Sequence, residues 1–470
     1  MQSARSAILT AVASAVLVAC GGSHDQGPSA PAPVPGNTSV ATPKAVCGPG
    51  SRPETGMQGR VTAEEQASGR AAEGYTCNTE LVGAYTTANP VGSVAGYKVE
   101  RYVDKSGREC AYYDTTILFP TSALQGLGVN VMDMSDPANP QLATRLITPA
   151  MLSPHESLVV SQQAGVLAAV MGNFVTYPGI VDVYDLSEDC RSPQLRSSAL
   201  VGVLGHESGI APDGKTFYTS SIGTPTLTAV DISDPARPRR LLTTNYQSHG
   251  LSISADGNRA YLASGTFTNT GLVILDVSDI QARKPNPEVR EISRLVWDNM
   301  SIPQNAMPFS RNGKPYLLEI DEFASNSDRG LPAANGINVG AARIIDISDE
   351  TQPFVVSELR LEVHQPENRE ITKDDPGAGG VIGGYAGHYC NVPTTVDPDI
   401  AACSMILSGL RVFDIRDVHR PREVAYFNPP VDRSGNNAVA RPAFAPERKE
   451  IWYSDTKSGL YVIRVTNGAW

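Results

Sequence analysis

The chain has 470 residues, with 49 acidic and 38 basic side chains and a formal net charge of −11 at pH 7. This mildly acidic balance argues against nucleic acid, and against an anionic lipid surface, as the partner of the folded part. Beyond the N-terminal segment no apolar run is long enough to cross a bilayer, which argues against a multispanning membrane protein.

The N-terminus predicts export. Residues 1–19 place a basic residue before an apolar run that is too short for a membrane-spanning helix. The run ends in LVAC, which resembles a bacterial lipobox and implies cleavage before Cys20 and a lipid on its sulfur. The alternative is an ordinary signal peptide with an accidental cysteine. Glycines at 21 and 22, where an inner-membrane retention signal would have Asp, favour the outer membrane.

Residues 21–62 are rich in Gly, Pro, Ser and Ala, as in the stretch GPSAPAPVPG. Such a composition cannot bury a core. We therefore predict that residues 20–72 form a flexible tether that holds the folded domain away from the membrane.

A short pattern then recurs seven times: a small residue, alternating apolar and β-branched side chains, and an Asp that opens a turn. The closest spacing is 45 residues, from Asp231 to Asp276. A period of this length, with only strand and turn signals, is typical of a β-propeller with one four-stranded blade per repeat. The copies are GVNVMDMSDP (128–137), GIVDVYDLSED (179–189), TLTAVDISDP (226–235), GLVILDVSDI (271–280), AARIIDISDE (341–350), GLRVFDIRDV (409–418) and GLYVIRV (459–465).

The Asp and Ser side chains of these repeats have a predicted structural role. Both can bond nearby backbone amides, and a following proline presets the next backbone angle, so the turn is specified locally. We expect no catalysis from them.

These repeats resemble the LVIVD-repeat family of bacterial and archaeal surface propellers, over about residue 73 to the C-terminus. GVNVMDMSDPANP and TLTAVDISDPARP carry the resemblance most clearly, together with GLVILDVSDI. It implies a propeller fold and an envelope location, and little about chemistry.

The two ends of the chain predict how the ring closes. After the seventh copy only residues 466–470 remain, too few for a fourth strand. Residues 77–86, CNTELVGAYT, resemble the fourth strands of other blades. We therefore predict an all-β, seven-bladed propeller over residues 73–470, whose N-terminal strand completes the last blade and leaves short edges.

Cysteine use agrees with export. With Cys20 set aside, six cysteines remain, an even number that suits an oxidising compartment. Cys390 and Cys403 lie on the two arms of one predicted hairpin, so we expect a disulfide between them. The other pairings stay open.

Four of the seven histidines share one register. His206 and His249 each stand seven residues before the Asp of their hairpin turn, at the start of an innermost strand. His155 and His388 begin the innermost strands of their own blades, and Asn305 holds the same place in the fifth blade. Since innermost strands line the central channel, these four imidazoles are expected to converge at one mouth.

Neutral imidazoles that lie at the same level along the channel axis are suitable ligands for Cu, Zn, Fe or Ni. Glu156 and Glu207 directly follow two of the histidines and are predicted, with Asn305, to act as second-shell groups or bases. The competing interpretation is structural. The Gly-His pairs at 205–206 and 387–388 resemble those of WD40 propellers, where the histidine bonds within a blade. The loops after the second strands lack the Asp partner that this interpretation requires, and both remain open.

Two insertions, residues 326–340 and 364–387, are predicted on the mouth that carries the histidines. Long loops on a rigid ring commonly bind a ligand or control access to it. The alternative is that they are surface insertions without a function. The glycine-rich stretch 377–384 is expected to be a flexible lid. Tyr389 and Arg441 fall beside the histidines, where they would contact a ligand or bridge blades.

The sequence supports two functions. The first is a lipid-anchored binding module of the cell envelope, whose histidine-lined mouth holds a metal ion (Cu, Zn or Fe) or a small ligand. The second is a metal-dependent enzyme, an oxidoreductase, that uses the same histidines. The expected partners are the membrane, through the anchor, and a protein, glycan or small molecule.

Overall fold

The computed structural model describes residues 40–86, 96–115, 128–171, 179–264, 271–297, 299, 301–325, 333, 336–380, 383–430 and 436–470. The predicted export signal, Cys20 and the first part of the expected tether lie outside these residues. Among the described residues, no helix combines the length and apolarity needed to span a bilayer.

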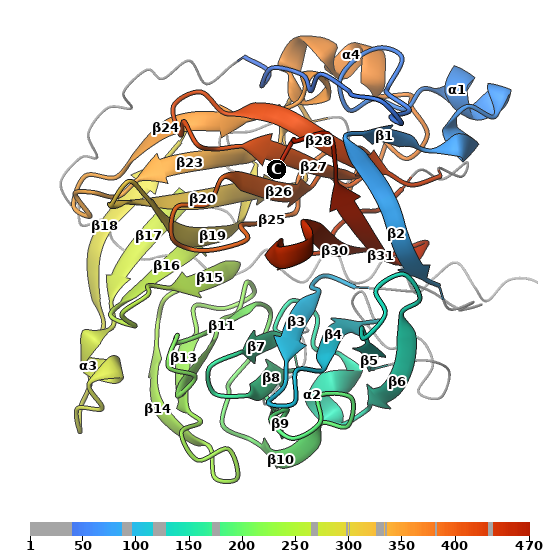
Figure 1. Cartoon of the computed structure of the whole chain (residues 1–470). Coiled ribbons are helices and arrows are strands. Elements are labelled where there is room, and N and C mark those ends of the chain that lie inside the picture. Colours follow the sequence, from blue (N-terminus) through green and yellow to red (C-terminus); the bar gives the residue numbers. More distant parts are fainter. Residues whose placement is uncertain are drawn as a thin grey trace, which may run out of the picture. The chain divides into compact units, whose positions relative to one another are not determined.

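Seven antiparallel sheets follow one another around an axis as the blades of a β-propeller, as predicted (Figure 1). Blades 1 to 4 each contain four consecutive strands, with the first strand innermost. They are β3 (Glu100–Val103), β4 (Glu109–Asp114), β5 (Val129–Asp133) and β6 (Gln141–Leu146) in blade 1; β7 (Val159–Ser161), β8 (Val166–Val170), β9 (Val181–Asp185) and β10 (Gln194–Ala199) in blade 2; β11 (Ser208–Ile210), β12 (Thr216–Thr219), β13 (Leu227–Asp231) and β14 (Arg239–Thr244) in blade 3; and β15 (Gly250–Ile253), β16 (Arg259–Ser264), β17 (Gly271–Asp276) and β18 (Arg290–Val296) in blade 4.

Blades 5 to 7 depart from this pattern by an added ribbon, an added strand and a strand from the other end of the chain. They are β19 (Ile302–Arg311), β20 (Lys314–Glu322), β23 (Ala342–Asp346) and β24 (Phe354–Leu359) in blade 5, with the ribbon β21 (Ala324–Ser325) and β22 (Asn338–Val339); β25 (Tyr389–Asn391), β26 (Ile400–Ser404), β27 (Leu410–Asp414), β28 (Arg422–Asn428) and β1 (Tyr75–Cys77) in blade 6; and β29 (Ala443–Ala445), β30 (Glu450–Asp455), β31 (Gly459–Val465) and β2 (Thr79–Tyr85) in blade 7.

Helices are short and lie outside the sheets. The α-helices are α1 (Ala63–Ser68), α2 (Pro149–Leu152), α3 (Ser278–Gln281) and α4 (Arg369–Thr372), and the 3₁₀ turns are η1 (Ala71–Glu73), η2 (Glu362–His364), η3 (Pro366–Asn368) and η4 (Pro446–Arg448).

Each repeated pattern forms the third strand of its blade. Its apolar side chains are buried between neighbouring sheets. The Asp that ends the strand bonds locally, as predicted. In blade 3 the backbone N–H of Ser233 donates to Asp231 Oδ1 at 3.0 Å, and the Ser233 hydroxyl donates to the same oxygen at 2.6 Å. These residues therefore serve the turn and take no part in the site described below.

The ring closes as the ends of the chain predict. Strand β2 pairs antiparallel with β31, from Thr79 opposite Val465 to Tyr85 opposite Leu460. The first and last parts of the chain thus share blade 7, and separating blades 7 and 1 requires both this pairing and the contacts between the two blades to break.

The segment just before this strand was predicted to be part of a flexible tether, and its described part is packed instead. Residues 40–74, which we term the N-terminal strap, lead into β1, which adds a fifth strand to blade 6 by pairing with β28. Cys47 of the strap is disulfide-bonded to Cys77. The carboxylate of Glu54 pairs with the buried guanidinium of Arg411. Specific ion pairs and a disulfide hold the strap, and its composition does not reveal them.

The 364–387 insertion is also packed where it is described. The Tyr385 hydroxyl donates to Asp375 Oδ2 at 2.9 Å, and the same carboxylate oxygen lies 2.7 Å from Nε of Arg60 in the strap. Ala378, within the stretch expected to form a lid, is buried. Most of the 326–340 insertion lies outside the described residues.

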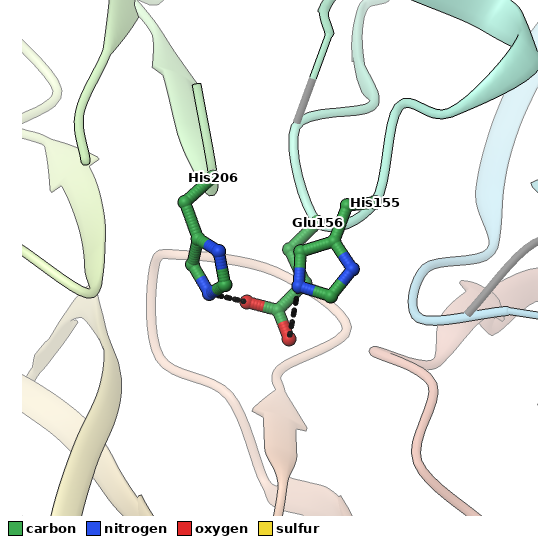
Figure 2. A group of neighbouring side chains, drawn as sticks. All are labelled: His155, Glu156 and His206. Carbon is green, nitrogen blue, oxygen red and sulfur yellow. Dashed lines mark ion pairs between the residues drawn. The ribbon is translucent and has the colours of Figure 1, made fainter. Parts of the chain in front are cut away.

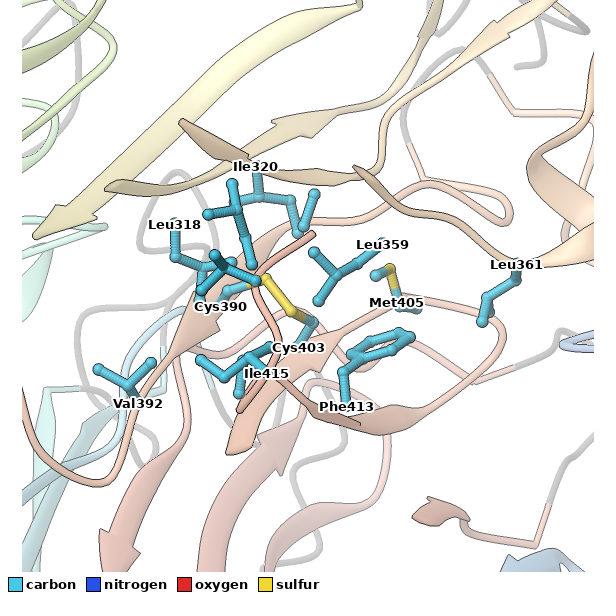
Figure 3. Packing of buried hydrophobic residues seen from close by; sticks show 14 of the residues in the cluster. Leu318, Ile320, Leu359, Leu361, Cys390, Val392, Cys403, Met405, Phe413 and Ile415 are labelled. Carbon is cyan, nitrogen blue, oxygen red and sulfur yellow. A yellow bond between two sulfur atoms is a disulfide. The ribbon is translucent and has the colours of Figure 1, made fainter. Parts of the chain in front are cut away.

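The core consists of apolar layers between adjacent blades, and Figure 3 shows the layer between blades 5 and 6. The predicted disulfide lies in it: Cys390 and Cys403 are directly opposite in β25 and β26, with Cα atoms 4.0 Å apart. A third disulfide joins Cys110 of blade 1 to Cys190 of blade 2.

Candidate metal centre

The four histidines predicted to converge lie close together. The ring centres of His155 and His206 are 4.4 Å apart, and those of His206 and His249 are 4.9 Å apart. His388 joins them through Tyr97, whose ring centre is 5.3 Å from that of His388 and 4.5 Å from that of His155. Tyr97 comes from blade 1, so five of the seven blades place a ring here.

The fold positions these side chains at the points where innermost strands begin. The His249 N–H donates to the Ala263 carbonyl at 2.9 Å, and the His388 N–H donates to the Ser404 carbonyl at 3.0 Å. The backbones of His249 and His388 are therefore each fixed by the second strand of their own blade. His155 has a φ of 49°, in the left-handed region that a non-glycine residue enters at a cost. Such conformations concentrate at functional sites.

Glu156 occupies the middle of the cluster, closer than the second-shell position predicted for it. Figure 2 shows its carboxylate between two imidazoles: Oε2 lies 3.3 Å from His206 Nε2, and Oε1 lies 3.9 Å from His155 Nε2. Oε1 is also 3.3 Å from His388 Nε2, and Oε2 is 4.0 Å from His249 Nε2. One carboxylate thus faces all four imidazoles.

Backbone carbonyls set the orientation of two imidazoles. His249 Nδ1 lies 3.0 Å from the Pro303 carbonyl oxygen, and His388 Nδ1 lies 2.7 Å from that of Val439. A carbonyl can only accept, so Nδ1 carries the proton in both rings and Nε2 points inward. This is the usual way in which a protein orients a metal-binding histidine.

A second carboxylate, that of Glu322, was missed by the sequence analysis. It ends β20, and its two oxygens each lie 3.2 Å from an imidazole, Oε1 from His249 Nε2 and Oε2 from His388 Nε2. The available signal was the run LLEIDE, in which three carboxylates interrupt an apolar strand. Buried carboxylates need partners, so such a run marks a site or a buried ion-pair network.

Glu207, predicted to act as a second-shell group or base, is held by two neighbouring side chains. Its Oε1 accepts from Lys98 Nζ at 2.9 Å and from the Asn305 amide at 2.8 Å, and all three side chains are buried. Among the described residues its Oε2 has no hydrogen-bond partner.

In blade 5 the residue that reaches the centre is Gln304, one position before Asn305, whose own side chain contacts Glu207. The amide of Gln304 donates to Glu156 Oε2 at 2.6 Å and to the Tyr389 hydroxyl at 2.9 Å. The reason is a register shift between Pro303 and Asn305 in the pairing of β19 with β20, which inserts Gln304 as an extra residue. Bulges of this kind redirect side chains. Arg441 pairs with Glu100, between blades 7 and 1.

The surroundings shift the pKa values of the two central carboxylates, Glu322 and Glu156, in opposite directions. Burial raises the pKa of Glu322 to about 7, although the hydrogen bond from His388 acts in the opposite direction. Burial also acts to raise the pKa of Glu156, but the imidazoles of His155 and His206 outweigh it and hold that pKa well below its ordinary value. Glu156 is thus held in its ionised form, which is the form that binds cations.

The pKa values of two imidazoles, His249 and His388, are also shifted in opposite directions. Burial lowers the pKa of His249 to about 3, so this ring is neutral at physiological pH. Burial acts to lower the pKa of His388 as well, but its contacts with Glu156 and Glu322 raise it to about 10. The cluster therefore stabilises positive charge at one point on the axis.

The donor atoms fit a transition metal. One ligand atom from each of His155, Glu156 and His206 can be chosen so that all lie within 4.8 Å of one another. Imidazole nitrogen and carboxylate oxygen are ligands of Zn, Cu and Fe. Among the described residues, neither ring nitrogen of buried His206 makes a hydrogen bond, as expected for a ring whose partner is an ion.

Comparisons with known proteins concern the fold. A search of curated proteins found no match. Among solved structures the chain is similar to hydrazine synthase of Kuenenia stuttgartiensis, with 14% identity over 81% of this chain and 99% of that chain and a TM-score of 0.51. A putative 6-phosphogluconolactonase from Bacteroides uniformis gives 12% identity over 73% and 88%, with a TM-score of 0.48. At 14% identity the first likeness shows the fold alone.

The family model of the LVIVD repeat matches residues 249–281, which begin at His249 and cover β15, β16 and β17 of blade 4. The chain is therefore a seven-bladed β-propeller that carries an LVIVD repeat.

Proposed function

We propose that the propeller binds a divalent transition-metal ion on its axis, through His155, Glu156 and His206. The observation that carries this proposal is the grouping of their ligand atoms within 4.8 Å, in a buried site. Zinc binds imidazole nitrogen and carboxylate oxygen at about 2.0–2.2 Å, so two ligands of one ion lie at most about 4.4 Å apart. The measured separations need only a small closing movement.

The structural interpretation of the histidines accounts for part of the geometry. The Nδ1 bonds of His249 and His388 fix loops of neighbouring blades, as a structural histidine would. Protons on the imidazoles account for the carboxylates opposite Nε2 of both rings, as the raised pKa of His388 indicates. They leave the ring nitrogens of His206 without a hydrogen bond among the described residues, and a bound cation would supply that partner.

The test is metal analysis of the full chain, purified without a histidine tag and loaded separately with Zn²⁺, Cu²⁺ or Fe²⁺. His206→Ala removes a ligand whose ring nitrogens make no hydrogen bond among the described residues and contact only Glu156, another proposed ligand, so the fold should survive. His419→Ala, an exposed histidine in the turn before β28, is the matched control. We expect at least one ion per chain in the wild type and the control, and loss of that ion in His206→Ala. Equal metal in all three proteins, or none in any, would refute the proposal.

We further propose that the propeller is an envelope binding module, exported and attached to the outer membrane through a lipid on Cys20. The three disulfides support an oxidising compartment, because every cysteine among the described residues is paired. Fractionation tests this location. The wild type should sediment with outer membranes, and Cys20→Ala should not. The same distribution for both proteins would contradict the anchor.

A metal-dependent enzyme is the second candidate, and Glu207 favours it. This buried carboxylate follows His206, and one of its oxygens has no hydrogen-bond partner among the described residues. Burial raises its pKa, although Lys98 acts against the shift. Buried groups with raised pKa values beside a metal site are candidates for general bases. If the protein is an oxidoreductase, Glu207→Gln should retain the metal and lose turnover.

A further inference from the structure

Among the described residues, one buried basic side chain lacks a counter-ion. Basic side chains are almost never buried unless they are paired. The buried ones here are Lys98, Arg343, Arg360, Arg369 and Arg411. All of them except Arg369 form an ion pair with a carboxylate: Lys98 with Glu207, Arg343 with Glu319 and Asp321, Arg360 with Glu358, and Arg411 with Glu54 and Glu423.

Arg369 lies in α4, within the 364–387 insertion, and only 7% of it is exposed. Its Nε donates to the carbonyl oxygen of Gly336 at 2.8 Å. This is the one hydrogen bond of its guanidinium to the residues that the structure describes, so both terminal nitrogens are left without an acceptor there. A buried cation in this state is unfavourable unless an anion joins it.

The acidic residues of the same insertion do not supply this anion. Asp375 pairs with Arg60, and Glu370 pairs with Lys373. The other acidic side chains of the insertion are exposed to solvent, and they form no ion pair with any residue that the structure describes. The charge of Arg369 therefore has no counter-charge within its own loop.

The buried imidazole of His364 responds to this charge. Burial lowers the pKa of His364 to about 3, and the guanidiniums of Arg360 and Arg369 act in the same direction. A carboxylate beside Arg369 would oppose that shift. The surroundings of Arg369 are thus electropositive, in a chain whose net charge is −11.

Arg369 connects the two insertions near the histidines. Gly336, in the first insertion, packs so closely on Ser325 that a β-carbon at Gly336 would lie 2.5 Å from the Ser325 backbone nitrogen. The Gly336 carbonyl is therefore fixed in place, and it fixes the guanidinium in turn. Gly387, at the end of the second insertion, forms a β-bridge with Glu322 of the central cluster. Both insertions thus reach the mouth that carries the histidines, and Arg369 holds them together.

We propose that Arg369 anchors a binding site for a small oxyanion, the carboxylate or phosphate group of a solute, on this mouth of the propeller. With Nε held by a carbonyl, the two terminal nitrogens present parallel N–H groups, which match the two oxygens of such a group. This inference goes beyond the proposed function. It does not depend on the metal, because Arg369 and Gly336 are not proposed metal ligands.

The experiment measures binding of two probes, inorganic phosphate and acetate, to the full-length chain after metal has been removed by chelation. Equilibrium dialysis with radiolabelled probe, at an ionic strength held constant with sodium chloride, gives the number of bound anions and their dissociation constant. We expect one bound anion per chain for at least one probe. Arg369→Gln should weaken this binding about tenfold or more, because it removes the charge and the paired donors. Arg237→Gln, on an exposed arginine before β14, is the matched control and should bind as the wild type does.

A second measurement separates a binding site from a structural arginine. In urea denaturation, the probe that binds should raise the midpoint of the wild type and leave that of Arg369→Gln unchanged. If Arg369 only supports the loop at Gly336, the variant loses the same stability with and without the probe, and the proposal is overturned.

The choice of probe identifies the ligand class. Binding of phosphate alone assigns a phosphorylated ligand, and binding of acetate alone assigns a carboxylic acid. Binding of neither probe to the wild type, or equal binding to the wild type and Arg369→Gln, would overturn the proposal. If Arg369→Gln fails to fold, Arg369→Lys decides the question. It keeps the charge but not the paired donors, so it should bind severalfold more weakly, and an affinity equal to that of the wild type would also overturn the site.

Discussion

The buried ion pair between Lys98 and Glu207 lies next to the proposed site, and its strength can be tested without metal. Nζ lies 2.9 Å from Oε1, and the side chains are 0% and 1% exposed. With an effective dielectric constant of about 20, two unit charges at this distance attract each other by roughly 6 kcal/mol. The Asn305 amide, which donates to the same oxygen at 2.8 Å, retains part of the stabilisation of Glu207 when the lysine is removed.

Lys98→Met preserves the length of the side chain and leaves the carboxylate of Glu207 buried without its counter-ion. We expect it to lower the free energy of unfolding of the metal-free protein by about 3–5 kcal/mol, the usual cost of breaking a buried pair from one side. Urea denaturation measures this value, with Glu207→Gln and the double variant completing the cycle. The double variant buries no charge of the pair, so it should recover at least half of the loss. If Lys98→Met costs less than about 1 kcal/mol, or the double variant is no more stable than the single one, the pair is not a buried ion pair.

Three further predictions concern stability around the site. Burial raises the pKa of Asp114 to about 8, so its stabilising contribution is complete below pH 4 and is lost as pH rises toward 8. Asp114→Asn should therefore gain stability relative to the wild type between pH 5 and pH 8 in urea denaturation, and parallel profiles would contradict this. Replacing Cys110 and Cys190 by serine opens a cross-link of 80 residues and should cost about 4–5 kcal/mol; an unchanged midpoint in the same assay would show that the bridge constrains little. Gly250→Ala would place a methyl group against Glu207 Oε2 and a backbone carbonyl, so we expect a loss of about 1–3 kcal/mol, and an unaffected midpoint would mean that this backbone moves freely.

The fold could be predicted from the sequence because its signals are local and repeated. Each third strand carries its own turn, as Asp231 and Ser233 show, and the missing strand of blade 7 follows from the length that remains after Val465. The strap could not be predicted. It is held by Glu54 on Arg411 and by the disulfide from Cys47, and these partners are far apart in sequence. The amino-acid composition of the strap shows that it has little apolar surface to bury. It does not show the ion pairs that hold the strap instead.

The site was predicted in part for a similar reason. His206 and His249 stand at the same position relative to the hairpin turns of their blades. Because the blades repeat around the axis, both side chains are placed near it. Register fails where blade 5 departs from the repeat: the bulge moves Gln304 to the centre, and Glu322 enters from the end of a second strand. A carboxylate that reaches the axis from this place belongs to no repeated pattern. It becomes visible only when the blades are assembled.

Ring closure and the site depend on each other. Blade 1 contributes Tyr97 and Lys98, and these residues are fixed by blade 7, since the Arg441 N–H donates to the Tyr97 carbonyl at 2.8 Å and the Val99 N–H donates to the Arg441 carbonyl at 3.0 Å. If β2 leaves β31 and these contacts also break, the seam opens and Lys98 moves away from Glu207. An ion bound on the axis contacts several blades at once, so it binds the closed ring and not the opened one. Binding of this kind stabilises the closed state by about 2.7 kcal/mol when the free ion is at a hundred times its dissociation constant. The proposed metal is therefore expected to stabilise the closed propeller as well as to form its functional centre.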